Sequence, residues 1–95
     1  MLYTLTKESK SAFRILGSRF LSILFPANNI RGFEDRLRAL RQEYHDSSHH
    51  CSAYRFLEHP VKEYSSDDGE PSGTAGLPIL NELRSAELLN AACIV

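Results

Sequence analysis

The chain has 95 residues and a formal net charge of −1, which limits it to one small domain with a single core. Bulk charge gives no support to a nucleic-acid partner, and no segment approaches the ~20 apolar residues of a membrane span, so we expect no membrane association. Two cysteines, Cys51 and Cys93, do not make a disulfide framework, and we expect the reducing cytoplasm as the compartment.

The first predicted elements are two strands within residues 11–25. This segment is rich in Phe, Ile and Leu and is interrupted once, at Gly17-Ser18, which predicts a tight turn or bulge between the strands. Alternate residues of a strand share one face, so one face of the second strand should meet the core. Its members are Leu21, Ile23 and Phe25.

A helix is predicted over residues 30–44, where apolar side chains recur every three or four positions. Asn28 or Asn29 is the expected N-cap, because an Asn side-chain oxygen accepts a first-turn N–H that otherwise lacks a partner. The apolar face consists of Ile30, Phe33, Leu37, Leu40 and Tyr44.

The second half predicts a strand over residues 49–57, a return strand over 61–65, a helix and a final strand over 90–95. The helix follows a long loop, with Thr74 as its expected N-cap and Leu77, Leu80 and Leu83 on its apolar face. The order is ββαββαβ, which predicts an α+β domain, and we expect a mixed sheet with two helices on one face.

The final strand has no element after it. An edge strand offers unpaired N–H and C=O groups, and the residues from Ala92 to Val95 are too apolar for an exposed edge. We therefore expect the chain to form a homodimer through this uncovered strand or to be poorly soluble and loosely packed.

The loop before the second helix, SSDDGEPSGTAGLP at residues 65–78, holds Asp67, Asp68 and Glu70 among glycines. A helix N-terminus favours an anion, which these acids would repel. One interpretation is that the acids accept the loop's own N–H groups. The other is that they bind Mg²⁺ or Ca²⁺, which prefer oxygen ligands.

A second cluster of candidate ligands is His49-His50-Cys51, with His45 upstream. These residue types bind zinc, but consecutive strand residues face opposite ways, so the simpler interpretation is a core cysteine beside two partly exposed histidines. Arg55 shares a face with Cys51 and is expected to bind either a phosphate or, preferably, a loop acid such as Asp67.

The segments HHCSAYRF and DDGEPSGTAGLPIL together resemble the two signature segments of the YigZ/IMPACT family. GSRFLSIL at 17–24 and LRALRQEYHDSSHHC at 37–51 also resemble the family's opening strand and first helix, so the resemblance extends from about Lys10 onward. It implies a fold similar to the second domain of ribosomal protein S5, which is analogy and not function.

The resemblance also implies the binding residues. They form a signature loop, Asp67, Asp68, Gly69, Glu70, Pro71, Ser72, Gly73, Thr74 and Gly76, and a signature strand, His49, His50, Cys51, Tyr54 and Arg55. Ser52 stands where a larger residue is expected, and family members continue beyond the position of Val95. Residues 1–95 are thus expected to form a partial Impact N-terminal-like domain that lacks the C-terminal remainder and the ferredoxin-like domain.

Eukaryotic members of the family are translational regulators that bind a partner protein, whereas bacterial members have no settled activity. We expect a non-enzymatic binding module that contacts a protein or RNA on the ribosome, with no cofactor and no catalytic residue. The alternative is a divalent-metal-dependent enzyme that acts on a phosphate ester or nucleotide through Asp67, Asp68 and Glu70.

Overall fold

The structure is a computed structural model that describes residues 3–15, 18–45, 49–69 and 73–95, with the side chains of 13–15 and 18–20 outside the description. The predicted order ββαββαβ is confirmed. The elements are β1 (Ser9–Ile15), β2 (Ser18–Pro26), α1 (Ile30–Glu43), β3 (Ser52–Phe56), β4 (Lys62–Ser66), α2 (Gly76–Ser85) and β5 (Ala91–Ile94).

One five-stranded sheet runs in the order β1-β2-β5-β3-β4, and every neighbouring pair is antiparallel. The expected mixed sheet is therefore wrong. β2 and β3 run parallel to each other, but they are not neighbours, because β5 lies between them and is antiparallel to both. Because β5 lies between them, β2 and β3, the two strands that α1 connects, do not form a parallel pair.

β5 is central and not an uncovered edge, so the expected homodimer through this strand loses its structural basis. All four residues of β5 are buried, and the N–H of Val95 donates to the carbonyl of Cys51 at 2.8 Å. The apolar character of this strand on both faces is typical of a strand with a covering layer on each side.

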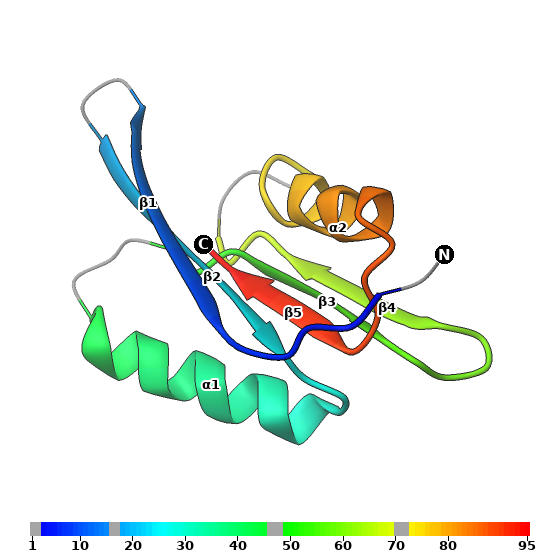
Figure 1. The fold of residues 1–95 in the computed structure, drawn as a ribbon. Coiled ribbons are helices and arrows are strands. Elements are labelled where there is room, and N and C mark those ends of the chain that lie inside the picture. The colour runs from blue at the N-terminus through cyan, green and yellow to red at the C-terminus, as the bar shows by residue number, and fades with distance from the viewer. Residues whose placement is uncertain (1–2, 16–17, 46–48, 70–72) are drawn as a thin grey trace.

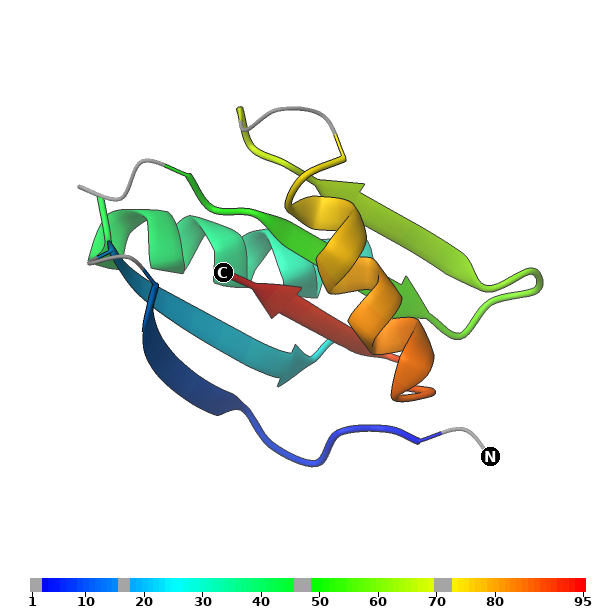
Figure 2. The ribbon, with the colours of Figure 1, turned by 90° about the horizontal axis from the view of Figure 1, so that it is seen from above.

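The two helices lie on opposite faces of the sheet, α1 below it and α2 above it in Figure 1, and not on one face as expected. The alternation of β5 explains the arrangement. Ala92 and Ile94 belong to the core between the sheet and α1. Cys93 belongs to the smaller core between the sheet and α2. Figure 2 shows α2 lying across the sheet with α1 behind it.

The larger core confirms the predicted face of β2 and that of α1 except at Ile30, which is exposed. Ile23 and Phe25 are buried against α1, and Phe33 stacks edge-on against Tyr54 with 4.9 Å between ring centroids. Asn29 is the N-cap, and its Oδ1 accepts the N–H of Gly32 at 2.9 Å. In the part of the chain that the structure describes, neither helix has the length and apolarity to cross a membrane.

The start of α2 differs from the prediction. Ala75, and not Thr74, occupies the N-cap position, and its methyl side chain accepts no hydrogen bond. Leu80 and Leu83 are buried as expected, whereas Leu77 is exposed. The first turn therefore needs an acceptor from elsewhere in the chain.

Candidate functional site

Asp67 supplies the acceptor for the first turn of α2. Its Oδ1 accepts the N–H of Gly76 at 2.7 Å and of Ala75 at 3.1 Å, and its Oδ2 accepts the N–H of Gly73 at 2.9 Å. These hydrogen bonds, that from Gly76 foremost, lower the pKa of Asp67. For this acid, the interpretation that the loop satisfies its own N–H groups is confirmed.

The same turn of α2 approaches the end of β4 so closely that only glycine fits at position 76. A Cβ on Gly76 would lie 2.6 Å from both the backbone N and the backbone O of Ser66. The Ser66 hydroxyl in turn accepts the N–H of Asp68 at 3.2 Å. The signature loop is therefore closed onto β4 at both of its ends.

Asp68 joins the signature loop to α1 and to the signature strand. Its carboxylate accepts two hydrogen bonds from Arg41, at 3.0 and 3.3 Å, and the backbone N–H of His50 at 2.7 Å. Burial acts to raise the pKa of Asp68, but the hydrogen bonds from Arg41 and His50 outweigh it and lower the pKa.

His49 and Cys51 also bind the backbone of the loop. Nδ1 of His49 lies 2.6 Å from the carbonyl oxygen of Asp68, and because a carbonyl only accepts, Nδ1 carries the hydrogen. The Cys51 thiol donates to the carbonyl of Asp67 at 3.3 Å. Gly69, at φ 92°, places its backbone against the His49 ring. The two segments that resembled one family thus form one hydrogen-bonded unit.

His50 points into the protein on the α1 side of the sheet and is buried. Burial first, and then the positive charge of Arg41, lower its pKa, while Asp68 acts in the opposite direction. Its Nε2 is buried and has no hydrogen-bond partner among the described residues. Burial and the charge of Arg41 therefore favour the neutral imidazole. The expectation of a partly exposed side chain is wrong for this histidine.

Metal-ligand geometry is not assembled in the described residues, which contain no group of three or more His, Cys, Asp and Glu able to hold an ion. The oxygens of Asp67 and Asp68 have separate partners on opposite sides of the loop. Glu70, Pro71 and Ser72 lie outside the described residues, so their place in the site remains a prediction.

Arg55 does not bind Asp67, and that expectation is wrong. Its Nε lies 2.9 Å from Oε2 of Glu63, the residue directly opposite it on β4, and Glu63 also accepts two hydrogen bonds from Arg84. Sequence reasoning missed Glu63, although its place opposite Arg55 follows from the hairpin register. It also missed Arg41, for which no local pattern gave a signal.

Tyr54 lies in the core and not on the surface of the candidate site. It is buried and stacks between Phe56 and Tyr64, with ring centroids 4.1 and 4.9 Å away. Burial is the main cause that raises its pKa.

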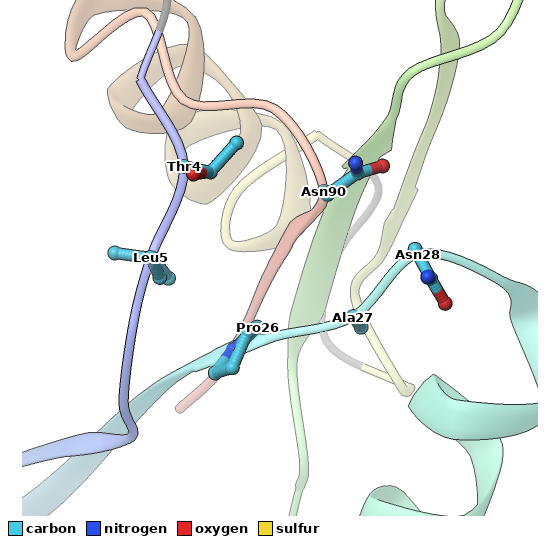
Figure 3. Close-up of a pocket in the computed structure, with 6 residues that line it drawn as sticks. All are labelled: Thr4, Leu5, Pro26, Ala27, Asn28 and Asn90. Atoms are coloured by element: carbon cyan, nitrogen blue, oxygen red, sulfur yellow. The ribbon is translucent and has the colours of Figure 1, made fainter.

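An open hollow of about 370 Å³ lies away from the signature segments, between the N-terminal segment and the turn after β2 (Figure 3). Among the described residues, its lining contains no charged side chain and no signature residue. The lining residues are Thr4, Leu5, Pro26, Ala27, Asn28 and Asn90.

These features define a class: a three-layer helix–sheet–helix domain that carries a preformed glycine-rich loop at one end of its sheet. The sequence profile of the Impact N-terminal domain matches residues 16–95, and the chain belongs to that family. The resemblance and the α+β fold that it implied are confirmed.

The relatives carry the same family name. The chain is 29% identical over 93 residues to IMPACT family member YvyE of Bacillus subtilis (strain 168), covering 98% of this chain and 43% of that protein. It is 31% identical over 80 residues to IMPACT family member YigZ of Escherichia coli (strain K12), covering 82% and 39%. The chain thus spans about two-fifths of the length of these curated relatives.

A solved structure, described as the crystal structure of a hypothetical protein, has the same fold. Its TM-score to this chain is 0.84 at 27% sequence identity, and the match covers 94% of this chain and 44% of that chain.

Proposed function

We propose that this chain is a non-enzymatic recognition module of the cytoplasm that regulates translation by contact with a protein or with RNA on the ribosome. Family membership supports a role shared with the IMPACT proteins. The observation that carries the proposal is the use of the two loop acids. The carboxylates of Asp67 and Asp68 accept hydrogen bonds from other parts of the chain and so hold the loop. This use suits a recognition surface better than acid–base chemistry.

The described parts of the loop, 67–69 and 73–76, offer a hydrogen-bonded backbone and little side chain to a partner. Asp68, Gly69 and Gly73 all have positive φ, at 45°, 92° and 78°, and their conformations are held by the hydrogen bonds around them. Gly69, Gly73 and Thr74 are exposed, and small residues allow another backbone to approach closely. A preformed loop also loses less conformational entropy on binding than a flexible one.

Between the two partner classes, the charges favour a protein. Arg36 and Arg41 each donate two hydrogen bonds to one carboxylate, of Glu8 and Asp68, and Arg84 does the same to Glu63. A guanidinium that is already paired in this way has less to offer a phosphate. We therefore place contact with a protein before contact with RNA.

The rival proposal is a divalent-metal-dependent enzyme that uses Asp67, Asp68 and Glu70 on a phosphate ester or nucleotide. In that case the cation would have to displace the N–H groups of α2 from Asp67 and the guanidinium of Arg41 from Asp68. We rank this proposal second because no geometric observation favours it.

Site-specific photo-crosslinking tests the recognition module. A photoreactive phenylalanine at the exposed Thr74 should give a discrete crosslinked protein in cells, and the same probe at Ser11, on the opposite edge of the sheet, should not. Cosedimentation with purified ribosomes separates the RNA class, since such binding weakens steeply with salt. No crosslink at Thr74 and no cosedimentation at low salt would contradict the proposal.

A hydrolysis assay tests the rival. Hydrolysis of p-nitrophenyl phosphate that needs Mg²⁺ or Mn²⁺ and disappears in Asp68→Asn would replace the recognition module by the metal-dependent enzyme. The matched control is Asp35→Asn, which changes an exposed carboxylate on α1 far from the loop in sequence.

A further inference from the structure

β4 is one of the two edge strands of the sheet, the other being β1. Among the described strands it pairs with β3 alone, and Figure 2 shows it at the outer side of the sheet, opposite β1. Its three central residues, Glu63, Tyr64 and Ser65, are exposed. An edge strand carries a row of N–H and C=O groups without partners, which is a template for pairing with another strand.

Tyr64 is the large apolar side chain on this edge. It stacks on Tyr54 with ring centroids 4.9 Å apart and planes 15° apart, and it meets Phe33 edge-on at 6.0 Å. It nevertheless stays 41% exposed. The row of stacked rings on β3 and β4 therefore ends at Tyr64, which is partly exposed to solvent.

Two residues of β4 are charged, Lys62 and Glu63, and the remaining positions are Tyr and Ser. The carboxylate of Glu63 is compensated within the chain, because it is paired with both Arg55 and Arg84. The second arginine and Lys62 leave this edge positively charged, so the favoured register for a second strand is one in which neither Lys62 nor Glu63 faces a like charge.

We propose that β4 pairs with β4 of a second copy of this chain, antiparallel and across a two-fold axis at Tyr64. Residues directly opposite each other in an antiparallel pair lie on the same face, so a self-pairing register must be centred on a residue. A register centred on Lys62 or on Glu63 places that charge opposite its own copy.

The remaining registers are also less favourable than the one at Tyr64. Centring on Ser65 places Glu63 opposite Asp67 of the second copy, and centring on Ser66 places Tyr64 opposite Asp68 and shortens the overlap. Centring on Tyr64 pairs all five residues of β4 and sets serines opposite the charged residues. The placement of the charged residues and the length of the strand overlap thus both favour the register centred on Tyr64.

This register also continues the aromatic row. Tyr64 of one copy faces Tyr64 of the other, with Tyr54 of each copy stacked behind, so the exposed side of the ring is covered. Aromatic cross-strand pairs add to sheet stability. One five-residue strand pair buries little surface, so the dimer is weak and depends on concentration.

Sedimentation equilibrium over a wide range of concentration tests the self-association. The wild-type chain is expected to move reversibly from monomer to dimer. Tyr64→Lys, which sets two ammonium groups opposite each other, is expected to weaken dimerisation at least about fivefold. Ser11→Lys, on the exposed edge strand β1, is the matched control and should leave it unchanged. Circular dichroism establishes that both variants fold.

Cysteine crosslinking tests the register independently. Opposite residues of an antiparallel pair have Cα atoms about 4.5–5.5 Å apart, within the range of a disulfide, so Tyr64→Cys should give a crosslinked dimer on mild oxidation. Ser65→Cys should not, because Ser65 faces Glu63 of the second copy. A monomer at every concentration, or equal crosslinking in both variants, would overturn the proposal, as would a dimer that Ser11→Lys abolishes and Tyr64→Lys does not.

Discussion

The carboxylate of Asp67 accepts the backbone N–H of Gly76 at 2.7 Å, nine positions later in the chain. A helix usually takes its cap from the residue at its own N-terminus, but here Ala75 occupies that position and offers no acceptor. The cap therefore depends on a side chain that lies nine positions before the helix and not on the residue at the helix end.

Removing this cap should lower stability. Asp67→Ala leaves three loop and helix N–H groups without their acceptor, so its urea midpoint should fall further than that of Asp35→Ala, which removes an exposed helical carboxylate. Because the folded pKa of Asp67 is lowered from 3.8, its contribution is present above that value and is lost as the pH falls through the folded value. Equal midpoints for both variants would contradict this role.

The approach of α2 to β4 predicts opposite effects for one substitution at two glycines. Gly76→Ala places a Cβ 2.6 Å from the Ser66 backbone and should destabilise the chain by about 1–3 kcal/mol. Gly32→Ala, whose Cβ would lie at an ordinary contact distance of 3.6 Å from Oδ1 of Asn29, should raise stability by up to about 1 kcal/mol. Urea denaturation measures both. A neutral Gly76→Ala would mean that the helix start does not lie against β4 as described.

Arg41 should control the titration of His50 and Asp68 together. Burial and the charge of Arg41 lower the pKa of His50, while hydrogen bonds from Arg41 help to lower that of Asp68. Arg41→Gln should therefore raise both pKa values, as measured by NMR titration of the ring and carboxyl carbons. Arg38→Gln, which removes an arginine paired with Asp35 on the same helix, is the control and should change neither.

The same histidine sets a pH dependence of stability. Its folded pKa lies below the ordinary value of 6.5, so the unfolded chain binds the proton more readily. The contribution of neutral His50 is fully present above pH 6.5 and is lost as the pH falls from there through the folded pKa. His50→Gln should reduce this part of the pH dependence in urea titrations, and an unchanged slope would show that another group causes it.

Asn90 has two structural roles, one in the backbone conformation and one in a side-chain hydrogen bond. Two substitutions distinguish these roles. It has a positive φ of 51°, and its Oδ1 accepts the N–H of Leu57 at 3.0 Å. Asn90→Gly keeps the backbone conformation and loses the hydrogen bond, whereas Asn90→Ala loses the bond and places a Cβ in the left-handed region. The alanine variant should be less stable than the glycine variant by about 1–2 kcal/mol in urea denaturation. The reverse order would contradict the conformational role.

Local pattern was enough to predict the elements and most of the buried residues of β2 and of the two helices. The alternation at Ile23 and Phe25, the helical spacing around Phe33 and the cap at Asn29 all depend on residues within a few positions of one another. The sequence also carried the two signature segments, His49–Arg55 and Asp67–Gly76, by which the family was predicted and then confirmed. These features need no knowledge of how distant segments meet.

Tertiary structure decided the position of β5, the placement of the helices on both faces and the partners of the charged residues. From the sequence, the final apolar strand was expected to be an uncovered edge, whereas its pairing with both β2 and β3 makes β5 a central strand. Asp68 meets Arg41 across 27 positions, and Arg84 meets Glu63 across 21. Such contacts are set by the path of the chain through the fold, because the period of a helix or strand fixes which way a side chain points and not what it meets there.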